Sequence, residues 1–219
     1  MRQRSTRRGH GFTLIELLVA ISLMALMAVL SWRGLDGISR AQGQLLGRAD
    51  QVQTLQTTLG QWTADLDAMA EQPDLPGLDW DGRALRILRR AGVEADAGLR
   101  VVAWTQRSVN GLGQWLRWQS PPLQNRSDLD LAWQKAALWA QSPGDDDRLR
   151  EVQTVALDGW QIFYFRQNAW TNPLSSAGTD DARPALPEGV RLVLSLAPGQ
   201  AISGTLTRDW VQPLLGGGK

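Results

Sequence analysis

The stretch GFTLIELLVAISLMALMAVLS, residues 11–31, contains the feature that decides how this chain is organised. Its residues 12–31 are apolar or uncharged apart from Glu16, and a helix of about 20 such residues is long enough to cross a bilayer. Four arginines, at positions 2, 4, 7 and 8, precede it, and no acidic residue does. This charge bias predicts that the N-terminus stays in the cytoplasm while the rest of the chain crosses the membrane.

Two ordinary interpretations of this segment are a cleaved signal peptide and a simple signal anchor. A cleaved signal peptide has an apolar region of about 7–15 residues followed by small residues of A-x-A type, whereas this run is longer and its Ala25 and Ala28 have the wrong spacing. A simple signal anchor explains the length but not the carboxylate. Since an ionised carboxylate is costly in lipid, we expect Glu16 to have a functional partner.

Residues 8–20, RGHGFTLIELLVA, resemble the N-terminal motif of type IV pilins and pseudopilins, which fill every position from Gly11 to Val19 in the same way. The resemblance implies that prepilin peptidase cuts the Gly11–Phe12 bond, removes residues 1–11 as a basic leader and methylates the new amine of Phe12. Glu16 matches the glutamate of the family motif. Its carboxylate would pair with the terminal amine of a neighbouring subunit, so we predict an assembly role for it.

Composition argues against several classes of function. Cleavage of the leader leaves 19 basic residues (23 less four) against 22 acidic ones, a formal charge of −3, so no nucleic-acid partner is expected. The chain has no cysteine, and its one histidine, His10, lies in the leader. Without His or Cys the mature chain cannot form the usual nucleophile pairs or zinc sites. We therefore predict that it is not an enzyme.

No cofactor or metal is predicted either. The three consecutive aspartates at positions 145–147 lack the alternating spacing of a calcium loop, so they are interpreted as a solvated acidic loop. Asp65 and Asp67 offer two carboxylates for an acid–base pair, but their polar context predicts exposed side chains without a pocket. The eleven tryptophans are expected in the core, Trp62 among them, and at a protein interface.

The remainder of the chain predicts an α+β fold of pilin type. No proline occurs between Phe12 and Pro73, so one long helix is expected, with residues 12–32 as its transmembrane half and residues 33–72 as an amphipathic half. Residues 73–219 are expected to form a β-rich domain whose antiparallel sheet packs on this helix. The helix–sheet core is predicted from apolar residues at spacings of three and four, namely Leu45, Val52, Leu55, Leu59, Trp62 and Leu66.

Three local predictions concern the β-rich domain. Residues 152–157 and 160–166 are expected to form two strands joined by a turn at Asp158-Gly159. Residues 190–196 and 201–208 are expected to form a C-terminal hairpin around Pro198-Gly199. Residues 129–140 fit a short helix as well as a strand.

The C-terminal part, from Leu157-Asp158-Gly159 through Trp170 to the run LPEGVRL at 186–192, is similar to the J class of type II secretion minor pseudopilins. The same holds for RGLD at 33–36. This resemblance implies a single-pass inner-membrane protein with a periplasmic domain, located at the tip of a pseudopilus. The implied partners are prepilin peptidase, the I- and K-type minor pseudopilins, the major pseudopilin, the inner-membrane assembly platform and membrane lipid.

Two alternatives stay open on the sequence. One is a minor pilin of a type IV pilus or of a DNA-uptake machine, because the N-terminal motif is the same. The other is a signal-anchored periplasmic enzyme or binding module, which would show no cut at Gly11–Phe12 and would tolerate loss of the carboxylate of Glu16.

Overall fold

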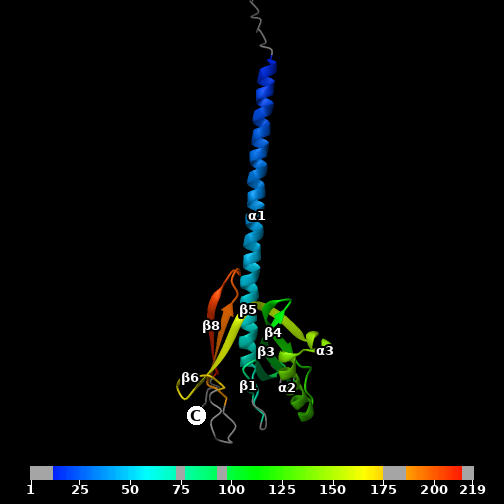
Figure 1. Ribbon diagram of the computed structural model, residues 1–219, viewed down its shortest axis with the longest axis vertical. Coiled ribbons are helices and arrows are strands. Elements are labelled where there is room, and N and C mark those ends of the chain that lie inside the picture. Colours follow the sequence, from blue (N-terminus) through cyan, green and yellow to red (C-terminus); the bar gives the residue numbers. More distant parts are fainter. Residues whose placement is uncertain (1–11, 73–76, 93–97, 175–185, 214–219) are drawn as a thin grey trace, which may run out of the picture. The chain divides into compact units, whose positions relative to one another are not determined.

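The computed structural model describes residues 12–72, 77–92, 98–174 and 186–213. The chain divides into two compact units, Met1–Arg48 and Ala49–Lys219. The boundary falls inside the helix α1 (Leu14–Asp67), the blue-to-cyan helix of Figure 1.

The described part of the first unit is helical from Leu14 onward. Its side chains are exposed, apart from the half-buried Ala20, and they include the whole apolar run. The helix that starts here is long and apolar enough to cross a membrane, with a mean hydropathy of 2.5 over its most apolar window. Exposed apolar side chains along a continuous helix are unfavourable in water and favourable in lipid.

The second unit is built on an antiparallel sheet that has eight strands within the described residues. The strands follow in the order β1-β2-β3-β4-β5-β7-β8, and β6 pairs with β5 beside this path. Their bounds are β1 (Leu78–Trp80), β2 (Ala84–Arg90), β3 (Leu99–Val109), β4 (Leu112–Gln119), β5 (Glu151–Arg166), β6 (Ala169–Thr171), β7 (Gly189–Leu196) and β8 (Gly204–Val211). Two further helices, α2 (Arg126–Gln141) and α3 (Asp145–Arg148), lie between β4 and β5 in the chain.

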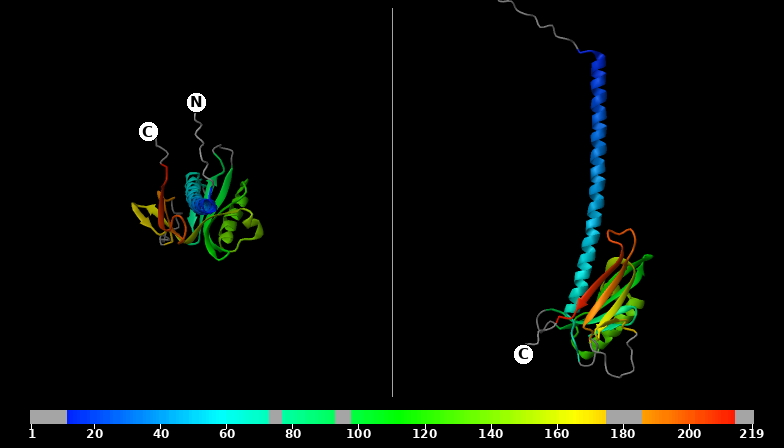
Figure 2. Two further views of the ribbon diagram at one scale, coloured as in Figure 1. Left: turned by 90° about the horizontal axis from the view of Figure 1, so that it is seen from above. Right: turned by 90° about the vertical axis from the view of Figure 1, so that its left-hand side faces the viewer.

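Alternating side chains of the central strands serve two different cores. In β3, Val102 and Trp104 belong to the core that contains residues of α1, whereas Val101 and Ala103 belong to the core that contains residues of α2. Because successive side chains of a strand point to opposite faces, the C-terminal part of α1 and the helix α2 cover opposite faces of the sheet. Figure 2 shows this arrangement from above. The predicted α+β fold, a long N-terminal helix on an antiparallel sheet, is confirmed.

Most of the predicted helix stripe lies where the sheet covers α1, but it starts later than predicted. Leu55, Trp62 and Leu66 are buried, Leu59 packs against the same cluster, and Val52 is half-buried. Leu45 is 66% exposed, so its assignment to the helix–sheet core is wrong. The spacing of three and four continues through Leu45, but a helical period alone does not indicate where the opposing sheet begins.

The strand β5 differs from the prediction of two strands and a turn. It is continuous from Glu151 to Arg166, and Asp158-Gly159 lies at a shift in register between Leu157 and Gly159. Before this irregularity β5 pairs with β4, and from Leu157 onward it pairs with β7. An Asp-Gly pair is compatible with a bulge as well as a turn, and here the strand bulges as it changes partner.

The structure also tests the predictions for the C-terminal hairpin, for residues 129–140 and for the tryptophans. The C-terminal hairpin is present as β7 and β8, joined through Gly199 with φ of 86°. Residues 126–141 are helical, and the Asn125 side chain caps α2 by accepting a hydrogen bond from the Asp128 amide. The core part of the tryptophan prediction is also confirmed, since the fully buried side chains include Trp62, Trp104, Trp115, Trp118 and Trp139.

Candidate functional site

The N-terminal end of α1 carries Phe12 and Glu16, whereas Gly11 lies outside the described residues. Phe12 is 83% exposed. The carboxylate of Glu16 bends back to the start of the helix, where its Oε2 accepts hydrogen bonds from Thr13 N at 2.9 Å and Thr13 Oγ1 at 2.8 Å. The Glu16 amide in turn donates to Thr13 Oγ1 at 3.4 Å. This is a capping box, and it satisfies amides that the first turn leaves without helical partners.

The capping box has a consequence for the chemistry of Glu16. Both hydrogen bonds go to Oε2, and Oε1 accepts none from the described residues. One carboxylate oxygen is therefore held locally while the other can accept a donor from outside the chain. The resemblance-based prediction that Glu16 meets the amine of a neighbouring subunit is compatible with this geometry.

The C-terminal part of α1 holds a buried carboxylate that contradicts the prediction of an exposed Asp65. The Asp65 side chain is 0% exposed and faces three strands. Arg117 from β4 donates two hydrogen bonds to it, Nε to Oδ2 at 2.7 Å and Nη2 to Oδ1 at 2.8 Å. Trp104 from β3 donates from Nε1 to Oδ2 at 2.9 Å, and Arg89 from β2 forms an ion pair with Oδ1.

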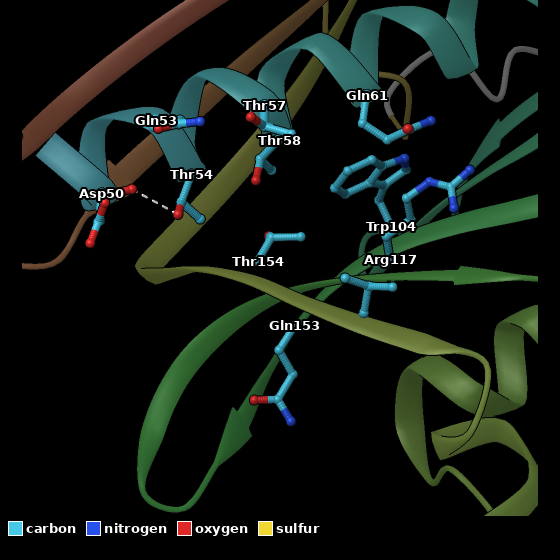
Figure 3. A pocket seen from close by; sticks show the side chains of 11 residues that line it. Asp50, Gln53, Thr54, Thr57, Thr58, Gln61, Trp104, Arg117, Gln153 and Thr154 are labelled. Atoms are coloured by element: carbon cyan, nitrogen blue, oxygen red, sulfur yellow. Dashed lines mark hydrogen bonds between the residues drawn. The ribbon is translucent and has the colours of Figure 1, made fainter.

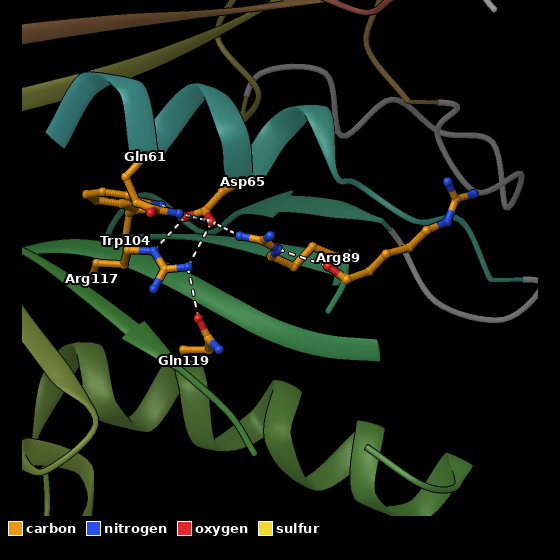
Figure 4. Close-up of polar contacts among 7 residues, drawn as sticks. Gln61, Asp65, Arg89, Trp104, Arg117 and Gln119 are labelled. Atoms are coloured by element: carbon orange, nitrogen blue, oxygen red, sulfur yellow. Dashed lines mark hydrogen bonds and ion pairs between the residues drawn. The ribbon is translucent and has the colours of Figure 1, made fainter. Parts of the chain in front are cut away.

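Figure 4 shows these side chains converging on Asp65, together with Gln61 one helical turn earlier. Gln61 donates to Asp65 Oδ1 at 2.9 Å, so all the donors are directed at one carboxylate. A buried charge is tolerated when it is paired and hydrogen-bonded, as here. The aspartate therefore fastens α1 to the sheet. Local polarity did not reveal this, because each partner from the sheet is at least 24 residues away in sequence.

The side chain of Asp67 contacts β8 and not the cluster around Asp65. Its side chain accepts a hydrogen bond of 2.8 Å from Trp210 Nε1 of β8. The two aspartates thus bind different strands and do not meet as an acid–base pair. Each tethers α1 to a different region of the sheet.

The acidic residues 145–147 form the short helix α3 rather than a fully solvated loop. Asp147 is buried, its Oδ2 accepts a hydrogen bond from the Gly144 amide at 3.2 Å, and its Oδ1 lies 3.3 Å from Lys135 Nζ. The prediction that the whole loop is solvated is therefore wrong for Asp147. Within the described ranges no group of three or more metal-ligating side chains comes together.

A groove of about 590 Å³ lies between α1 and the sheet in the second unit. Its helix wall is a stripe of polar residues that begins with the carboxylate of Asp50 and ends at Gln61. Thr154 of β5 points toward this wall, whereas the side chain of Gln153 points away from it (Figure 3). Arg117 lines the Gln61 end of the groove, next to the Asp65 cluster. The sequence does not predict this groove, because the helical spacing of its polar residues does not indicate which strand lies opposite them.

Comparisons with known proteins find a family motif at the N-terminus and a similarity that extends over most of the chain. Residues 6–32 match the family described as the prokaryotic N-terminal methylation motif. The chain is 26% identical over 198 residues to type II secretion system protein J of Klebsiella pneumoniae, which covers 88% of this chain and 91% of that protein. It is 33% identical over 98 residues to type II secretion system protein J of Escherichia coli, covering 44% of this chain and 48% of the relative.

The chain therefore combines an N-terminal methylation motif on an exposed apolar helix with a pilin-like arrangement, in which an antiparallel sheet packs on the C-terminal part of that helix. Over 88% of its length the chain is similar to type II secretion system protein J.

Proposed function

We propose that this protein is a minor pseudopilin of a type II secretion system, part of the pseudopilus tip complex that initiates pseudopilus assembly and supports export of proteins across the outer membrane. One observation carries the proposal: the methylation motif at residues 6–32 occurs in a chain that is similar to protein J over 88% of its length. Pilins and pseudopilins share the motif, and the similarity to protein J favours the secretion machine.

In this proposal prepilin peptidase cleaves the chain after Gly11 and methylates Phe12. The segment 12–32 then anchors the protein in the inner membrane, with residues 73–219 in the periplasm. The positive leader and the exposed apolar helix support this orientation.

Assembly in the proposal depends on Glu16. Its Oε1 takes the terminal amine of a neighbouring subunit while Oε2 keeps the capping box with Thr13. Two opposite charges attract each other strongly in lipid. Removal of one of them leaves the other charge unpaired there, which is costly. The neighbours would be the I- and K-type minor pseudopilins, the major pseudopilin and the assembly platform.

The test is deletion of the gene in its host, with exoprotein secretion and surface pili scored side by side. Lost secretion with normal pili is expected, and the intact gene should restore secretion. Normal secretion with lost twitching or DNA uptake would assign the protein to the pilus family instead. If neither function changed, a signal-anchored periplasmic module would replace the proposal.

A further inference from the structure

The strand β5 has an edge without a strand partner in the described chain, and this edge borders the groove between α1 and the sheet. Residues 151–156 pair with β4, through contacts such as Arg117 with Val152. On the other side of β5, pairing with β7 begins only at Leu157. An edge of this kind presents main-chain N–H and C=O groups to an added strand.

The groove is lined by three consecutive residues of β5, Val152, Gln153 and Thr154. Successive side chains of a strand point to opposite faces, so a groove that touches all three meets the edge of the strand and not only one of its faces. The helix wall opposite is Asp50, Gln53, Thr54, Thr57, Thr58 and Gln61. Their spacing of three and four places the carboxylate of Asp50 and these hydroxyl and amide groups on one side of α1 (Figure 3).

The dimensions of the helix wall and of the edge agree. From Asp50 to Gln61 the helix rises roughly 16 Å. That is the length of about five residues of extended chain, which matches the free part of β5. The Asp50 end is closed by the connection between β7 and β8, where Ala201 N donates to Gln51 Oε1 at 2.7 Å and Gln200 Nε2 to Ala156 O at 2.9 Å.

The two ends of the groove differ in charge. Arg117 lines one end, and its Nη1 makes no hydrogen bond to the described residues although Nε and Nη2 hold Asp65. Because two arginines surround the single carboxylate of Asp65, the cluster keeps one positive charge in excess. Asp50 lies at the opposite end and is negative.

We propose that this groove binds an extended segment of another protein, which adds as a strand to residues 151–155 of β5 with an acidic side chain directed to Arg117 and a basic one to Asp50. The free main-chain edge favours a polypeptide, since strand addition uses main-chain hydrogen bonds. The only aromatic residue of the lining, Trp104, is fully buried, so no ring is available to stack on a sugar.

A volume of about 590 Å³ suits a short segment rather than a second folded domain. The proposal concerns the second unit alone and holds whether or not the protein serves secretion.

The test uses the full chain in detergent micelles and two fluorescent peptides, Glu-Thr-Val-Thr-Val-Thr-Lys and the same residues in reverse order, because the direction of the added strand is open. Saturable binding of one of them, followed by anisotropy, is expected. Each peptide is also made with N-methyl groups on alternate amides, in both registers. Only alternate amides of an edge strand face their partner, so one register should weaken binding about tenfold or more and the other should be tolerated.

Two variants of α1 form a matched pair for the same assay. Thr57→Trp fills the groove and should abolish peptide binding, whereas Gln56→Trp adds the same ring at an exposed neighbouring position outside the lining and should leave it unchanged. Asp50→Lys should weaken binding of the original peptide, and a peptide with Glu in place of its Lys should restore it.

Equal binding of both methylation registers, or no saturable binding of either peptide, would overturn the proposal. Sedimentation gives a further check on the partner. A dimer of the wild-type chain that Thr57→Trp dissociates would assign the groove to a second copy and overturn the choice of another protein.

Discussion

Arg117 on β4 donates two hydrogen bonds, of 2.7 and 2.8 Å, to the carboxylate of Asp65 on α1, although the two residues are 52 positions apart in the sequence. The carboxylate is fully buried and the Arg117 side chain is 12% exposed. A bidentate arginine–carboxylate pair of this kind fixes orientation as well as distance. It therefore sets how the C-terminal part of α1 lies on the sheet.

Replacing Asp65 by alanine should destabilise the second unit strongly. The substitution leaves the guanidinium groups of Arg89 and Arg117 largely buried without their anion, which typically costs about 3–5 kcal/mol. Urea unfolding followed by tryptophan fluorescence measures the free energy of unfolding. Asp50→Ala, at an exposed position of the same helix, should change it by less than about 0.5 kcal/mol. A loss of under about 1 kcal/mol for Asp65→Ala would contradict the structural role.

Gly113 should not tolerate alanine. A Cβ atom at Gly113 would overlap the carbonyl oxygen of Leu157, at the point where β5 changes partner, and the backbone would have to move. Overpacking of this kind costs about 1–3 kcal/mol. The matched control is Gly60→Ala on α1, where a Cβ meets nothing within 4 Å and should stabilise the helix by about 0.5–1 kcal/mol. Equal unfolding midpoints for the two variants would refute the close contact.

Processing and assembly should respond to different substitutions. Gly11→Leu should block cleavage by prepilin peptidase because a bulky side chain occupies the cleavage position, whereas Gly11→Ala can still be cut. Glu16→Leu should be cleaved normally but fail to restore secretion in the deletion strain, because the partner amine loses its anion. Mass spectrometry of the N-terminus separates the two steps. Efficient cleavage of Gly11→Leu, or full secretion with Glu16→Leu, would count against the proposed function.

The ion pair between Arg191 and Asp209 predicts a small pH dependence at the C-terminal hairpin. Arg191 donates two hydrogen bonds of 2.7 Å to Asp209, which lower the pKa of that carboxyl below its ordinary value of 3.8. The stabilisation is therefore complete above this ordinary pKa and is lost as the pH falls through the lower pKa of the folded state. Because both side chains are partly exposed and screened by solvent, the contribution of the pair should be small.

The measurement for this pair is the difference in free energy of unfolding between wild type and Asp209→Asn as a function of pH. The difference should be constant near neutral pH and shrink in acid. In an Arg191→Leu background the difference should lose its pH dependence. A difference that grew on acidification would have the wrong sign and would exclude the pair as its cause.

The order of the chain, a long helix followed by a β-rich domain, follows from the sequence because its signals are local. The apolar run, the absence of proline up to Pro73 and the spacing around Trp62 each act within a few turns of helix. The motif from Gly11 to Glu16 is equally local, so the predicted cleavage and assembly residues needed no tertiary information. The C-terminal hairpin around Pro198-Gly199 was predictable for the same reason.

Only the tertiary structure decided the features that depend on distant partners. Leu45 follows the helical period yet meets no sheet, and Asp158-Gly159 bulges because β5 exchanges β4 for β7 at that point. The polar spacing around Asp65 indicated an exposed residue, but three strands supply donors from 24, 39 and 52 residues away. A helical or strand period indicates which side chains share a face, whereas burial and pairing depend on what the rest of the chain brings to that face.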